Sequence, residues 1–134
     1  MIRSVKMAKE IVVVSQNKVG TLGAVAAILA DRGVNIIALS AQAAGGVALM
    51  NFVTDDNLRA KDLLRKKGYS FQENDVLMLE VEDKPGVLSR ITKKLRAKKV
   101  NILNVYGSAP TSYGPCALVV STDHNQKAFV ALRA

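Results

Sequence analysis

Residues 81–102 read VEDKPGVLSRITKKLRAKKVNI, and a weaker copy of this stretch, VSQNKVGTLGAVAAILADRGVNI, occupies residues 14–36. Pairing Gly20 with Gly86, and likewise Leu22 with Leu88, gives one constant offset, 86 − 20 = 66. Both copies contain an apolar run, a polar turn that ends in glycine, a helical pattern, and Val-Asn-Ile at the start of a second apolar run. An internal repeat of this length predicts a duplicated small domain.

The repeat divides the 134-residue chain into two predicted domains, residues 7–74 and 75–134. In the first, the patterns predict a strand over 9–15, a helix over 21–32, strands over 34–43 and 47–54, a helix over 57–67 and a strand over 69–73. This β-α-β-β-α-β order is typical of the ferredoxin-like fold, an antiparallel sheet with both helices on one face. The predicted fold class is therefore α+β, with two ferredoxin-like repeats.

The second domain is predicted to repeat this order but to stop early. After a turn at 74–75, we expect a strand over 76–82, a helix over 85–98, strands over 101–108 and 116–122, and a helix from 123. The sequence ends at 134, where the first copy continues into its fourth strand. Without that strand, residues 76–82 form an exposed sheet edge, and such edges recruit partner strands. Either a second copy of the chain or the segment 69–73, captured across units, can cover this edge, and we favour a homodimer.

The composition excludes several classes of protein. No apolar stretch approaches the roughly 20 residues of a membrane span, and the start, MIRSVKMAKEIVVV, lacks the apolar region of a signal peptide. Met7 is an alternative start, which makes residues 1–6 a tail. The lone cysteine, Cys116, is expected to be a buried strand residue and fits a reducing cytoplasm.

No catalytic constellation is visible in the sequence. With one cysteine and one histidine, His124, a zinc site of the usual Cys/His kind is not available within one chain. Gly20-Thr-Leu-Gly23 matches neither a dinucleotide fingerprint nor a phosphate loop. The sequence therefore predicts a non-enzyme without metal or cofactor.

The second copy resembles the ACT domain family, whose hallmark is an Asp-x-Pro-Gly-x-Leu turn followed some fifteen residues later by Asn-Ile. Here the motif stands as DKPGVL over residues 83–88 and Asn101-Ile102. The first copy is similar but has Asn17 in place of the acid and Val19 in place of the proline. The whole chain thus resembles a stand-alone tandem ACT protein.

The resemblance implies regulation. ACT domains typically bind amino acids or similar small effectors between paired domains, control amino-acid metabolism and tend to associate, which implies a free amino acid, a metabolic enzyme and a second copy as partners. A carboxylate can dock at the helix-start N–H groups beside Gly20 or Gly86, with Asp83 for the ammonium and either Asn35 or Asn101 as a bridge. The candidate ligand-binding residues are Asn17, Gly20, Leu22, Asn35 and Ile36 in the first copy and Asp83, Gly86, Leu88, Asn101 and Ile102 in the second. Because Asn17 lacks the charge of Asp83, the second copy is expected to bind more tightly.

Structural roles for the same residues remain open at this level. Asp83 is also suited to cap a helix that has Pro85 near its first position, and the two asparagines are suited to closing helix-to-strand turns. A pure interaction module without an effector is one alternative function. Nucleic-acid binding is the other, because the net charge is +8. RNA-recognition sheets stack bases on exposed aromatics, however, and the predicted third strand of the first copy offers only Phe52. The basic run 93–99 is expected to be the solvated face of a helix that buries Leu88, Ile91 and Leu95.

Overall fold

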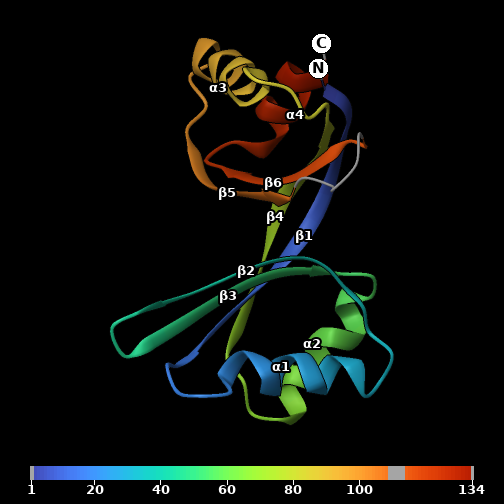
Figure 1. Ribbon diagram of the computed structural model, residues 1–134, viewed down its shortest axis with the longest axis vertical. Coiled ribbons are helices and arrows are strands. Elements are labelled where there is room, and N and C mark those ends of the chain that lie inside the picture. The colour runs from blue at the N-terminus through green and yellow to red at the C-terminus, as the bar shows by residue number, and fades with distance from the viewer. Residues whose placement is uncertain (1, 109–113, 134) are drawn as a thin grey trace. The chain divides into compact units, whose positions relative to one another are not determined.

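The computed structural model describes residues 2–108 and 114–133 (Figure 1). The elements in chain order are β1 (Ile2–Gln16), α1 (Thr21–Ala30), β2 (Ile36–Ala44), β3 (Val47–Thr54), α2 (Asn57–Lys66), β4 (Phe71–Val81), α3 (Val87–Ala97), β5 (Ile102–Ser108), β6 (Cys116–Thr122) and α4 (Asn125–Arg133). The strand order is β2-β3-β1-β4-β6-β5. The α+β class predicted from the sequence is confirmed, with six strands and four helices in the described residues.

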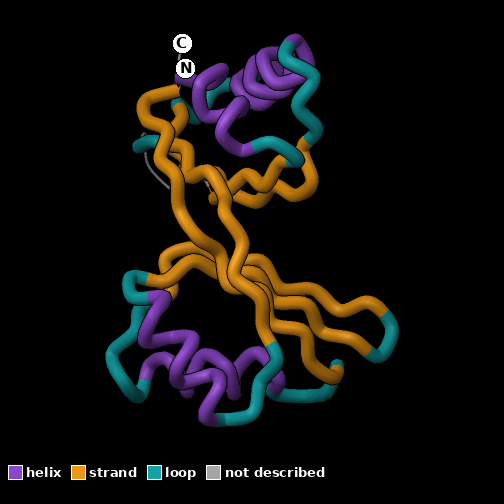
Figure 2. Tube along the Cα trace, turned by 180° about the vertical axis from the view of Figure 1, so that it is seen from behind, coloured by secondary structure: helices purple, strands orange, loops and turns teal. Residues whose placement is uncertain are grey.

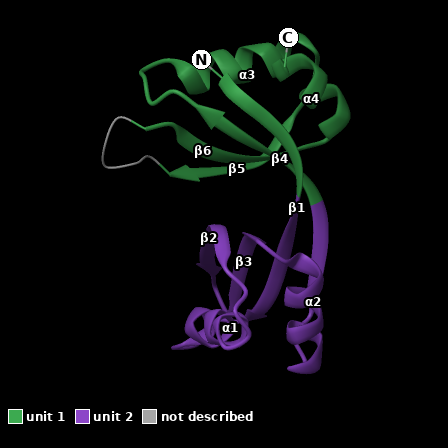
Figure 3. Cartoon of the chain, turned by 90° about the vertical axis from the view of Figure 1, so that its right-hand side faces the viewer, with its two compact units in different colours: residues 1–8, 75–134 green, residues 9–74 purple. Residues whose placement is uncertain are grey.

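The chain divides into two compact units, and one lies inside the other along the sequence (Figure 3). Residues 9–74 form the inserted unit, whereas residues 1–8 and 75–134 form the flanking unit. Two long strands contribute to both: β1 passes from the flanking into the inserted unit after residue 8, and β4 passes back after residue 74.

The inserted unit contains a sheet segment in the order β2-β3-β1-β4. Strand β3 pairs antiparallel with both β1 and β2, with Ile11 opposite Phe52. Both helices lie on one side of these strands (Figure 2), and Ile11, Phe52 and Leu29 are completely buried in the cluster between the two layers. Helix α2 begins at Asn57 as predicted, and the Asp56 side chain caps it by accepting a hydrogen bond from the amide of Arg59 at 3.1 Å.

In the flanking unit the start of the chain supplies the strand that the end of the chain lacks. Strand β1 lies next to β4. Ile2 and Val5 pack against the core around Leu79, and the hydroxyl of Ser4 donates to Glu80 Oε2 at 3.5 Å. In the described residues no strand follows α4, as predicted for the second repeat, but the prediction that residues 76–82 form a sheet edge is wrong, because β4 lies between β1 and β6. Residues 2–6 are part of a strand rather than a tail. The edge strands are β2 and β5.

The predicted turn at residues 74–75 is also wrong, because β4 runs through it without a break. The Nδ2 amide of Asn125 donates to the carbonyl of Asp75 at 2.8 Å. An equivalent bond joins Asn57 Nδ2 to the carbonyl of Lys9 at 2.9 Å, where β1 enters the inserted unit. Asn74 and Asp75, which favour turns, thus lie inside a continuous strand, and the carbonyl of Asp75 accepts its hydrogen bond from the Asn125 side chain.

The buried face of α3 differs by one residue from the predicted one, which was Leu88, Ile91 and Leu95. Val25 and Leu29 are buried on α1, but Leu22 is 38% exposed. On α3 the buried stripe is Val87, Ile91 and Leu95, whereas Leu88 is 52% exposed. The two motif leucines therefore lie outside the cores. No helix among the described residues is long and apolar enough to cross a membrane.

Candidate functional site

The turn before α1 borders a hollow of about 380 Å³ in the inserted unit. Three of the predicted site residues, Asn17, Gly20 and Leu22, line it from the turn and the start of the helix. The rest of its lining consists of Lys18, Thr21 and Gly23 from the same segment, Ala41, Gln42 and Ala43 from β2, and Ala48 and Met50 from β3. The hollow is thus walled by a helix start on one side and a hairpin on the other.

The helix start offers unused hydrogen-bond donors to this hollow. Gly20 is the N-cap in the left-handed conformation, with φ of 85°, and no side chain caps the helix. The hydroxyl of Thr21 does not cap it, because it donates to the carbonyl of Lys18 at 2.8 Å. Because the first amides of a helix have no intrahelical acceptor, the N–H groups of Leu22 and Gly23 are available to an anion.

Asn17, at the rim of the hollow, forms hydrogen bonds to the β2–β3 hairpin. Its Nδ2 amide donates to the carbonyl of Gly45 at 3.0 Å, and its backbone amide donates to the carbonyl of Gly46 at 2.9 Å. These two bonds tie the turn before α1 to the tip of the β2–β3 hairpin. The side-chain oxygen of Asn17 is the group that remains for a ligand.

A second hollow, of about 340 Å³, occupies the corresponding place in the flanking unit. Leu88 lines it from α3, and the strands β5 and β6 contribute Val105, Tyr106, Gly107, Ser108, Cys116 and Leu118. Gly86 caps α3 with φ of 90° and again without a side-chain cap, so Asp83 does not have the helix-cap role that the sequence left open. This hollow is more apolar than the first.

Asp83 interacts with Cys116 rather than with the helix. Cys116 begins β6 and is half-buried, not buried as predicted. Burial of the thiol and then the nearby charge and hydrogen bond of the Asp83 carboxylate raise the pKa of Cys116. The thiol therefore stays protonated at neutral pH and is a poor nucleophile.

The Asn-Ile pairs of the motif lie at the opposite ends of the helices from the glycines. Asn101 and Ile102 follow α3 and line a third hollow, whereas Gly86 precedes the helix. An 11-residue helix is about 16 Å long. The structure therefore does not bring Asp83, Gly86 and Asn101 together in one place, nor Asn35 and Ile36 with Gly20.

The backbone of each motif asparagine is tied to an aspartate at the helix-to-strand turn. The backbone amide of Asn35 donates to Asp55 Oδ1 at 2.9 Å, and the amide of Asn101 donates to Asp123 Oδ1 at the same distance. In return the amides of Asp55 and Asp123 donate to the asparagine carbonyls, each at 3.0 Å. Sequence reasoning did not identify these aspartates as partners, although both stand in a matching Thr-Asp pair.

The described residues contain no group of three or more His, Cys, Asp or Glu side chains suited to a metal ion. His124 is exposed at the start of α4, and its Nδ1 accepts a hydrogen bond from the amide of Lys127 at 3.2 Å. It is therefore part of the helix start.

Comparisons with known proteins agree with this architecture. The model of the ACT domain matches residues 9–66. The fold is similar to that of a protein from Bacteroides thetaiotaomicron (TM-score 0.89, 22% identity, 96% of this chain and 88% of that chain). It is also similar to the ligand-free regulatory subunit of aspartate kinase from Thermus thermophilus (TM-score 0.69, 15% identity, 98% and 96%) and to the aspartate kinase of Synechocystis (TM-score 0.62, 15% identity, 98% and 26%). No curated protein sequence matches the chain.

Residues 9–66 thus match the ACT domain model, and the fold of the chain is similar to that of the regulatory subunit of aspartate kinase from Thermus thermophilus.

Proposed function

We propose that this protein is a cytoplasmic, non-enzymatic regulator of tandem ACT type that senses a free amino acid and acts on an enzyme of amino-acid metabolism. The observation that carries the proposal is the hollow beside α1, where uncapped helix amides face a space of about 380 Å³ next to the glycine turn. The ACT match over residues 9–66 supports the same function.

The proposed binding mode follows from the chemistry of an amino acid. The carboxylate accepts hydrogen bonds from the amides of Leu22 and Gly23, where the helix dipole favours negative charge. The ammonium is within reach of neutral acceptors such as the side-chain oxygens of Asn17 and Gln42. The exposed Leu22 supplies an apolar contact for the side chain of the ligand.

We place the main site in the inserted unit, although the motif alone favours the second copy. The hollow beside α1 combines three predicted site residues with the uncapped amides. The hollow beside α3 retains only Leu88 of the predicted set. Asp83, which was to receive the ammonium, lies near the Cys116 thiol and contributes to raising its pKa, after burial.

A thermal-shift screen against the twenty amino acids, followed by calorimetry, tests the proposal. A ligand at a hundred times its dissociation constant stabilises the protein by about 2.7 kcal/mol. Gly20→Val and Gly86→Val form a matched pair, because both glycines have positive φ and neither has an atom within 4 Å of an added Cβ. We expect Gly20→Val to abolish binding and Gly86→Val to preserve it. The reverse result would move the site to the second copy, and no heat from any amino acid would refute the function.

The edge strands support the homodimer in a revised form. On β2, Ile37 and Leu39 are 51% and 42% exposed, and on β5 Leu103 is 62% exposed. We propose that one of these edges, rather than residues 76–82, carries the association. Light scattering at micromolar concentration decides it: a constant mass near 14.4 kDa contradicts a dimer.

Nucleic-acid binding is the weaker alternative. The Phe52 side chain, the one aromatic on the third strand, is fully buried between sheet and helices and has no face for a base. We therefore expect any retention of nucleic acid to be weak, salt-dependent and indifferent to sequence.

A further inference from the structure

The positive charge of this protein is concentrated on one helix. The flanking unit carries eleven Lys and Arg against five Asp and Glu, a net charge of +6, whereas the inserted unit carries eight against six. Residues 87–99 alone contain six Lys and Arg and no acidic residue. The corresponding residues 21–33 contain one arginine and one aspartate. This asymmetry does not arise from the fold, because both segments form the same kind of helix.

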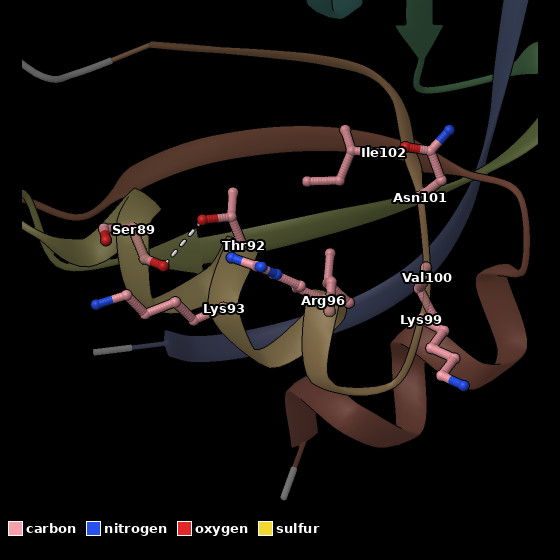
Figure 4. Close-up of a pocket in the computed structure, with 9 residues that line it drawn as sticks. Ser89, Thr92, Lys93, Arg96, Lys99, Val100, Asn101 and Ile102 are labelled. Carbon is pink, nitrogen blue, oxygen red and sulfur yellow. Dashed lines mark hydrogen bonds between the residues drawn. The ribbon is translucent and has the colours of Figure 1, made fainter.

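The charge borders a hollow of about 570 Å³ that is lined by α3 and by residues 99–102, which follow it (Figure 4). Its polar lining consists of Ser89, Thr92, Lys93, Arg96, Lys99 and Asn101. In the copy 66 positions earlier these places hold Gly23, Ala26, Ala27, Ala30, Gly33 and Asn35. All but the last have changed from small residues to hydrogen-bond donors. The corresponding positions of the inserted unit therefore lack this polar lining.

The three cations of the hollow lack an ion-pair partner among the described residues. Neither Lys93, Arg96 nor Lys99 forms an ion pair with any residue that the structure describes. Figure 4 shows Arg96 extending back along α3 toward Thr92, while the two lysines extend outward on either side. Both lysines are exposed, so they are able to swing in over a bound anion.

Lys99 provides a second, independent observation. Its φ is 57°, the one positive φ of a non-glycine residue in the described part of the chain. The residue 66 positions earlier is Gly33, with φ of 73°, which adopts this conformation without steric cost. A lysine at a position that favours glycine is under local strain. Strain of this kind is commonly retained where the side chain serves a function.

We propose that this hollow binds a phosphate dianion, either free or as the ester of a small metabolite, at a site separate from the amino-acid site. Arg96 has the planar donor fork that matches phosphate oxygens, and the lysines add point charges. The hydroxyl of Ser89, on the same helix face, is a further donor, whereas the hydroxyl of Thr92 already donates to the carbonyl of Ser89 at 2.9 Å. The hollow contains no aromatic side chain on which a nucleic-acid base can stack.

Titrations with ribose 5-phosphate, ribose and inorganic phosphate, followed by amide NMR shifts and calorimetry, test the proposal. We expect ribose 5-phosphate to bind and to shift the amides of residues 89–102, and ribose to give no shift. Equal affinity for inorganic phosphate identifies the free ion as the ligand, whereas tighter binding of the ester identifies a phosphorylated metabolite. The absence of binding by both phosphates at low salt overturns the site.

Three variants separate a built site from general attraction to a basic surface. Arg96→Gln should weaken ribose 5-phosphate about tenfold, the size of one charge-assisted hydrogen bond. Lys99→Gly should weaken binding while raising the melting temperature, because glycine relieves the strain. Lys98→Gln is the matched control, since Lys98 carries the same charge, is exposed and lies outside the lining.

The control decides the interpretation. We expect Lys98→Gln to change the affinity less than twofold, and an equal loss from Lys98→Gln and Arg96→Gln shows diffuse electrostatics and refutes the site. Binding of a single-stranded oligonucleotide to the same amides at physiological salt, more tightly than ribose 5-phosphate, also refutes it. The circular dichroism of each variant must match that of the wild type, and Lys99→Gly provides a second test if Arg96→Gln does not fold.

Discussion

Helices α1 and α3 have the same backbone start and opposite surfaces. Each follows a left-handed glycine, lacks a side-chain cap and exposes a leucine in its first turn. The exposed residues of α1 are Leu22, Gly23 and three alanines, however, whereas residues 87–99 carry six cations. The comparison teaches that one local fold can present small uncharged side chains on one helix and a cationic surface on the other, because the chemistry depends on side chains that the core does not constrain.

The two units also differ in which part of the chain supplies their fourth strand. In the inserted unit this strand is the first part of β4, which follows α2 in sequence. In the flanking unit it is the first part of β1, at the start of the chain. We therefore expect deletion of residues 2–8 to destabilise the protein more than any single substitution. The flanking unit would lose both a strand and the contacts of Ile2 and Val5 with its core.

Amide hydrogen exchange measures this directly. Protection over residues 77–81 and 118–122 should collapse in the deletion variant, while protection over residues 49–53 should persist. Unchanged protection in the flanking unit would show that its core is complete without β1.

Matched core substitutions test whether each unit has a core of its own. Leu29 and Leu95 are 66 positions apart, and both are fully buried, one in each cluster. Leu29→Ala and Leu95→Ala should each cost about 2–5 kcal/mol in free energy of unfolding. Urea unfolding followed by exchange should show each loss mainly in its own unit. Equal loosening of both units by either variant would mean that they unfold as one.

Residues 33 and 99 occupy corresponding positions with positive φ, and exchanging glycine and lysine between them tests the comparison further. Lys99→Gly should stabilise the protein by about 1 kcal/mol and Gly33→Lys should destabilise it by about as much, because only glycine adopts positive φ freely. Thermal unfolding of the two single variants measures both. The same sign for both would contradict a conformational origin.

The smallest expected effect concerns the ion pair between Lys61 Nζ and Glu73 Oε1, 2.8 Å apart, which holds the end of β4 against α2. The hydrogen bond from Lys61 lowers the pKa of Glu73 below its ordinary value of 4.5. The carboxylate therefore contributes stability that is fully present above pH 4.5 and is lost as the pH falls through the lower folded pKa. Glu73→Gln should cost about 1 kcal/mol at pH 7 and less at lower pH.

Asp62→Asn is the control for that measurement. Its pair with Lys66 is mostly exposed, with 53% and 71% of the two side chains accessible. We expect no measurable loss at either pH from this variant, as is usual for exposed pairs. A pH-independent loss from Glu73→Gln would show that packing, not charge, is the cause.

Much of the local structure was predictable because it depends on short-range patterns. The helices at 21–30 and 57–66, the hairpin around Gly45-Gly46 and the cap at Asp56 each follow from neighbouring residues. The exposure of Leu22 and Leu88 was not predictable, because a leucine in the first turn fits an apolar stripe whether or not the core reaches that far.

The candidate site was predictable only in part. Asn17, Gly20 and Leu22 are close in sequence and line one hollow. Asn35 and Asn101 share the motif but stand at the other end of a helix, and their partners, Asp55 and Asp123, are 20 and 22 residues away. Such distant pairings leave no periodic signal in the sequence.

By itself, then, the sequence determined the repeat, the α+β class and the glycine turns, because these depend on local conformational preferences and on periodic burial. Only the tertiary structure decided which segments complete which sheet. A strand is placed by hydrogen bonds to a neighbour that can lie anywhere along the chain, so residues 2–8 complete the unit formed by residues 75–134, more than sixty positions away. The same reason explains why the predicted edge at 76–82 is an interior strand and why β4 has no turn at its centre.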